Sequence, residues 1–156
     1  MSRDAAIRQA AAERGALAVG TIQRIQPNAT LARGFLTDAN AALELVPVAA
    51  ETYPPGAVLI LWDGIRKACA AHAIAHGIRF TQEASHGKAL TYAENALDGL
   101  VPPQAFGVLR LVLTERNDSA YVDPNRQATN LIDRALPVAT RLVETIAIDL
   151  GDEPAS

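Results

Sequence analysis

The fold is indicated most clearly by residues 126–150, RQATNLIDRALPVATRLVETIAIDL. Apolar residues recur in this stretch every three or four positions, which is the spacing of one buried face of an α-helix. Pro137 lies inside the stretch and predicts a kink, and Gly151 predicts its end. We therefore expect a long amphipathic helix whose apolar face is covered by partner helices. The expected buried residues are Leu131, Ile132, Ala135, Leu136, Val138, Ala139, Leu142, Val143 and Ile146.

The same helical spacing recurs upstream, between turns rich in proline, glycine and asparagine. It predicts an all-α fold, an antiparallel bundle of four main helices with a short linking helix and an N-terminal helical extension. Residues 78–84 read as a loop, and either Asn28 or Thr30 can cap the first helix of the bundle. The expected organisation is a helical extension over residues 1–25, a bundle over 26–150 and a flexible tail over 151–156. The expected helices cover about 2–15 or beyond, 29–51, 57–76, 86–97, 103–121 and 126–150.

Composition limits the possible functions. The chain has 156 residues, 49% of them hydrophobic and 20% charged, as in an ordinary soluble domain. A net charge of -3 does not favour non-specific nucleic-acid binding, although it is compatible with a local basic cleft. The single cysteine, Cys69, excludes an intrachain disulfide and reads as a packing residue. With no secretory leader or membrane span evident, we expect a cytoplasmic protein that does not enter a membrane.

A charged residue interrupts one apolar helix face. Phe106, Leu109 and Val112 outline this face, and Arg116 falls near its middle. A guanidinium there must be paired or must line a polar cleft, because it cannot lose its charge. The string Arg116-Asn117-Asp118-Ser119-Ala120-Tyr121 is therefore the first candidate site. Arg116 would bind a phosphate and Asn117 would orient it; the alternative is a structural ion pair with Glu44, Asp63 or another carboxylate.

Two other sets of polar residues, Asp63 with Arg66 and His72 with His76, each have a functional and a structural interpretation. Asp63 and Arg66 are three residues apart, so a salt bridge between them is sterically easy, although Arg66 could instead support the Arg116 cleft. His72 and His76 are four residues apart, and His86 could add a third metal ligand. No carboxylate lies between the two histidines, so a capping role at the helix C-terminus is favoured. We expect no metal and no cofactor.

Several segments, taken in order, resemble the HEPN superfamily of small helical bundles from prokaryotic defence and toxin–antitoxin modules. The similarity is to an actinobacterial-type subfamily and covers roughly residues 22–146. It rests on LWDGIRKA at residues 61–68, HGIRFT at 76–81, and His86 near the start of the next helix. The Arg116-Asn117-x-x-x-Tyr121 string and a long last helix complete the pattern.

The resemblance implies a homodimer whose cleft binds RNA or a nucleotide. HEPN ribonucleases use an arginine, an adjacent polar residue and a following histidine, and two such motifs meet across a dimer to cleave RNA without a metal. These roles carry over to Arg116, as the phosphate-binding residue, and to Asn117, as the adjoining polar residue. Apart from the resemblance, Asp63, Arg66 and Asp118 are candidates for supporting the cleft. Tyr121 stands where the histidine is expected, and a tyrosine with a pKa near 10 is a poor general base. Two hypotheses follow. In the first, the dimer cleft binds RNA or a nucleotide, and metal-independent cleavage of RNA is not expected to be strong. In the second, the protein is a catalytically inactive dimeric adaptor that docks a cognate protein partner.

Overall fold

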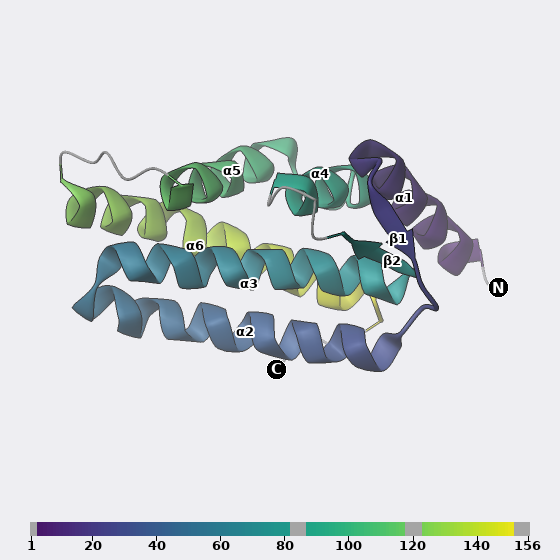
Figure 1. Cartoon of the computed structure of the whole chain (residues 1–156), viewed down its shortest axis with the longest axis horizontal. Coiled ribbons are helices and arrows are strands. Elements are labelled where there is room, and N and C mark those ends of the chain that lie inside the picture. Colours follow the sequence, from purple (N-terminus) through teal and green to yellow (C-terminus); the bar gives the residue numbers. More distant parts are fainter. Residues whose placement is uncertain (1–2, 82–86, 118–122, 152–156) are drawn as a thin grey trace.

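The computed structural model describes residues 3–81, 87–117 and 123–151, apart from the side chains of residues 3, 116 and 117. Within these ranges the chain is a helical bundle with one short two-stranded ladder (Figure 1). No helix in the described ranges has both the length and the apolar composition required to span a membrane. The elements are α1 (Arg3–Val19), β1 (Ile22–Arg24), α2 (Ala29–Thr52), α3 (Pro54–Ala75), β2 (Ile78–Phe80), α4 (Gly87–Ala96), α5 (Pro103–Asn117) and α6 (Pro124–Asp149).

The two longest early helices form an antiparallel pair. Asn28 begins α2, and its side chain accepts a hydrogen bond from the Leu31 backbone N–H at 2.9 Å, which confirms one of the two expected caps. Tyr53 alone separates α2 from α3. Gly64 of α3 lies so close to α2 that an added Cβ would be 3.0 Å from the Leu43 side chain. The missing side chain therefore lets the two helices approach closely.

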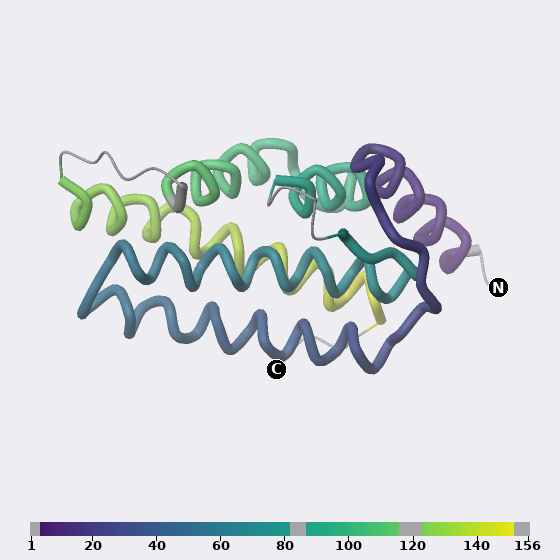
Figure 2. The backbone as a smooth tube through the Cα atoms, viewed as in Figure 1, coloured from purple at the N-terminus to yellow at the C-terminus, as the bar shows by residue number. Residues whose placement is uncertain are grey.

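The remaining long helices cover α3 with the apolar faces that the spacing predicts. Phe106, Leu109 and Val112 are buried on α5, as expected. On α6 the expected residues are buried except Leu136 and Val138, which are half-buried. In Figures 1 and 2, α3 and α6 run in the same direction, whereas α2 and α5 run in the opposite one. Pro47 lies inside α2 and Pro137 lies inside α6, and each helix continues through that proline.

The expectation of a loop over residues 78–84 is wrong for its first part. Ile78–Phe80 forms β2, which pairs antiparallel with β1, with Ile22 opposite Phe80. Gly77 makes the turn from α3 into β2 with a φ of +78°, a conformation that favours glycine. Its carbonyl accepts a hydrogen bond from the Ile25 N–H at 2.9 Å. A strand of three residues is too short for alternation to reveal it in the sequence.

The N-terminal helix is attached to the bundle through α4 and the β1–β2 ladder (Figure 2). It continues through Gly15 to Val19. Gly15 lies against Tyr92 of α4, where an added Cβ would be 2.6 Å from the Tyr92 ring and 2.8 Å from its carbonyl oxygen. This close contact brings α1 to the end of the bundle where α2 begins and where α3 and α6 end (Figure 1).

Candidate functional site

The string that the sequence analysis placed first lies largely outside the described residues. Arg116 and Asn117 are the last two residues of α5, but their side chains are not described. Asp118 and Tyr121 lie outside the described ranges, as does His86. The roles of Arg116, Asn117 and Tyr121 therefore stay predictions.

The Asp63–Arg66 salt bridge is confirmed. Arg66 Nη2 lies 2.6 Å from Asp63 Oδ1, and Lys67 Nζ lies 2.9 Å from Asp63 Oδ2. Partial burial raises the pKa of Asp63, but the hydrogen bonds from Lys67 and Arg66 outweigh this effect, and the net pKa is lowered. The three side chains therefore satisfy one another within α3.

A buried hydrogen-bonded chain links three helices through His72. The His72 side chain is 1% exposed; its Nε2 lies 2.7 Å from Asp149 Oδ2 on α6, and its Nδ1 lies 2.8 Å from Tyr92 Oη on α4. A carboxylate only accepts hydrogen bonds, so His72 Nε2–H donates to Asp149. In the neutral ring Nδ1 then accepts from the Tyr92 hydroxyl. Burial raises the pKa of Tyr92 well above its usual value, which keeps this hydroxyl protonated.

His76 closes the C-terminus of α3, which confirms the expected capping role for this histidine but not for His72, whose ring bonds Tyr92 and Asp149 instead. Its Nδ1–H donates to the His72 carbonyl oxygen at 2.9 Å, and its ring centroid lies 4.6 Å from that of His72. Burial lowers the pKa of His76, despite the opposing effect of its bond to the His72 backbone. Gln9 of α1 donates to the His76 carbonyl oxygen at 3.3 Å. His76 therefore ties the end of α3 to α1.

The hydrogen bonds of His72 do not suit a metal site shared with His76. Both ring nitrogens of His72 have protein partners, so neither presents a free lone pair. The described part of the chain contains no group of three or more histidine, cysteine or carboxylate side chains arranged to hold a metal ion. Cys69 is fully buried, and burial raises its pKa to about 12, as expected for a packing residue.

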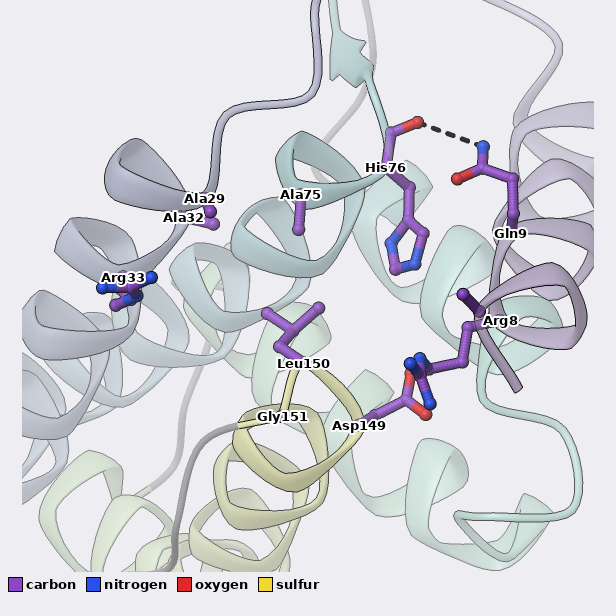
Figure 3. A pocket seen from close by; sticks show the side chains of 11 residues that line it. Arg8, Gln9, Ala29, Ala32, Arg33, Ala75, His76, Asp149, Leu150 and Gly151 are labelled. Atoms are coloured by element: carbon purple, nitrogen blue, oxygen red, sulfur yellow. Dashed lines mark hydrogen bonds between the residues drawn. The ribbon is translucent and has the colours of Figure 1, made fainter. Parts of the chain in front are cut away.

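A cavity of about 370 Å³ opens beside His76 and Asp149 (Figure 3). Arg8 and Gln9 reach it from α1, and Arg33 reaches it from α2. Within the described residues, neither Arg8 nor Arg33 has a carboxylate oxygen within the 4.0 Å of an ion pair. The remaining lining is mostly small or apolar: Ala5, Ala29, Ala32, Ala75, Leu150 and Gly151.

The cavity has two electrostatic sides. The N-terminus of α2 lies in its wall beside Arg33, and both contribute positive potential. The C-terminus of α6 lies in the wall with the Asp149 carboxylate, and both contribute negative potential. Arg8 extends from α1 toward Asp149 in Figure 3. A ligand that carries an anionic group together with hydrogen-bond donors matches this arrangement.

Apart from His76, the residues that line this cavity were not indicated by the sequence. The spacing indicated the pair His72 and His76 but not Tyr92 and Asp149, the partners of His72, which are 20 and 77 residues away from it. One local feature could have suggested the site, because Asp149 places a negative charge at a helix C-terminus, where the helix dipole disfavours it. Comparisons with protein-family models, curated proteins and solved structures find no match for this chain.

Proposed function

We propose that this chain binds a nucleotide, free or at an end of an RNA strand, through its phosphate in the cavity beside His76. The observation that carries the proposal is the presence of Arg8 and Arg33 in one cavity without an ion-pair partner among the described residues. Guanidinium groups bind phosphate oxygens in a bidentate manner, and a partly enclosed site strengthens such bonds. A volume of about 370 Å³ is within the usual range for small-molecule sites.

The resemblance described for the sequence supports the same class of ligand, because it implies RNA or nucleotide binding. We propose binding rather than cleavage, since Tyr121 stands where the resembled ribonucleases have a histidine. Arg116 and Asn117 end α5 at the opposite end of the bundle from the cavity (Figure 1). The cavity is therefore a separate phosphate site from the one expected at Arg116.

The test is calorimetric titration of the purified chain with nucleoside monophosphates, inorganic phosphate and a short single-stranded RNA. Arg33→Gln should weaken nucleotide binding about tenfold or more, the usual loss for a hydrogen bond to a charged group. Arg134→Gln is the matched control, because Arg134 is exposed near the middle of α6, fifteen residues before Asp149, and does not line the cavity. Absence of binding by the parent chain, or equal loss in both variants, would contradict the proposal. The RNA and the free nucleotides separate the two sources of phosphate.

The second function, a dimeric adaptor, is favoured by a different surface. Leu45 and Leu59 are each 49% exposed and line a hollow of about 560 Å³ between α2 and α3. Exposed leucines around a hollow are typical of a protein contact surface. We propose that a second copy of the chain covers this surface. Sedimentation should show a dimer that Leu59→Lys converts to a monomer, whereas a monomeric parent chain would exclude this arrangement.

A further inference from the structure

The Asp149 carboxylate is held in a fixed orientation at the negative side of the cavity. Its Oδ2 accepts the hydrogen bond from His72 Nε2, and its side chain is only 13% exposed. His72 is itself fixed by Tyr92 on the opposite side of its ring. An ionised carboxylate has about four lone-pair directions, and His72 occupies one of them. Oδ1 and the second lone pair of Oδ2 can therefore accept two neighbouring N–H groups of a ligand.

We infer that the cavity is selective for guanine among the common nucleobases, an inference that rests on the proposed nucleotide site. Guanine presents two adjacent N–H donors on one edge, N1–H and the 2-amino group, which match the two oxygens of a carboxylate. Adenine and cytosine place a ring-nitrogen acceptor beside their amino group. Uracil has one N–H between two carbonyl acceptors. Each of these three bases would therefore direct at least one acceptor toward the Asp149 carboxylate.

The remaining lining agrees with this orientation of the ligand. Arg33 and the N-terminus of α2 lie on the positive side and would contact the phosphate. Ala32, Ala75 and Leu150 contribute a small apolar surface on which a flat base can lie. His72 and Tyr92 act as positioning residues, because they orient Asp149 and are too deeply buried to contact the ligand themselves.

Titration of the parent chain with GMP, IMP, AMP, CMP and UMP tests the inference, because IMP differs from GMP only by lacking the 2-amino group. GMP should bind about ten- to a hundredfold more tightly than the others, the effect of one hydrogen bond to a charged acceptor. Asp149→Asn should reduce GMP affinity to the level of IMP or below, because the amide presents an N–H donor in place of an acceptor, and it should not weaken inorganic phosphate binding, because it removes a negative charge from the cavity.

The possible results separate the two proposals. Equal affinity of the parent chain for all five nucleotides would overturn guanine selectivity and leave the phosphate site in place. Absence of binding for every nucleotide and for inorganic phosphate would overturn both. Since the nucleotide series uses the parent chain, the inference can be refuted even if Asp149→Asn does not fold. Thermal denaturation of that variant establishes whether its loss of GMP binding is interpretable.

Discussion

Replacing Tyr92 with phenylalanine removes one buried hydroxyl and keeps the aromatic ring. The hydroxyl lies 2.8 Å from His72 Nδ1, and the two residues are 0% and 1% exposed. The remaining ring fills the same space, so the variant creates almost no cavity. The main effect is an unpaired nitrogen in the protein interior, which water cannot reach.

The expected cost follows from this burial. An unpaired buried hydrogen-bonding group destabilises a protein by about 1–3 kcal/mol, so we expect a loss of about 2 kcal/mol in the free energy of unfolding. For a domain of this size each kcal/mol lowers Tm by about 2–4 °C, which gives a decrease of about 4–8 °C. Differential scanning calorimetry and urea denaturation measure the two quantities independently.

Tyr53→Phe is the matched control for this variant. Tyr53 is 61% exposed, so loss of its hydroxyl should change stability by less than about 0.5 kcal/mol. If Tyr92→Phe is as stable as the parent chain, the Tyr92–His72 hydrogen bond does not contribute as described. An equal decrease in stability in both variants would also refute the reasoning, because the loss would then not depend on the burial of Tyr92.

Two further expectations concern packing in α1, α2 and α3. Gly15→Ala should destabilise the chain by about 2 kcal/mol or more, because its Cβ would overlap the Tyr92 ring and carbonyl. Gly34→Ala, inside α2 with open space around it, should instead stabilise by about 0.5–1 kcal/mol; urea denaturation showing the same sign for both would contradict this assignment. Cys69, with a pKa raised to about 12, should resist a thiol reagent at pH 8 until the chain unfolds. Rapid modification of the native chain, followed by absorbance, would show that Cys69 is accessible.

The helical architecture was predictable because the information for it is local. The Asn28 cap, the Gly77 stop and the apolar spacing of residues 126–150 each act within a few residues of the chain. The β1–β2 ladder was not predictable by the same means, because its two strands are three residues long and far apart in the sequence. The ladder is stabilised by the pairing of its two strands rather than by the β propensity of their residues.

The cavity was less predictable than the fold. Arg8, Arg33 and Asp149 come from three different helices, and each alone looks like an ordinary charged residue. Only the packing of α1, α2 and α6 at one end of the bundle brings them together. The sequence instead directed attention to Arg116, which stands out locally because it lies on an apolar helix face.

The attachment of α1 determines which part of the cavity can open. This helix is held by α4, by the short β1–β2 ladder and by the Gln9–His76 hydrogen bond, and its Leu17 side chain is 80% exposed. Because it is a terminal helix packed mainly against the short helix α4, it is expected to open by local unfolding before the long helices do. Such an opening would withdraw Arg8 and Gln9 while Arg33 and Asp149 stay in place. Amide hydrogen exchange in α1 should then slow when the cavity is filled, so this helix would report occupancy as a change in protection.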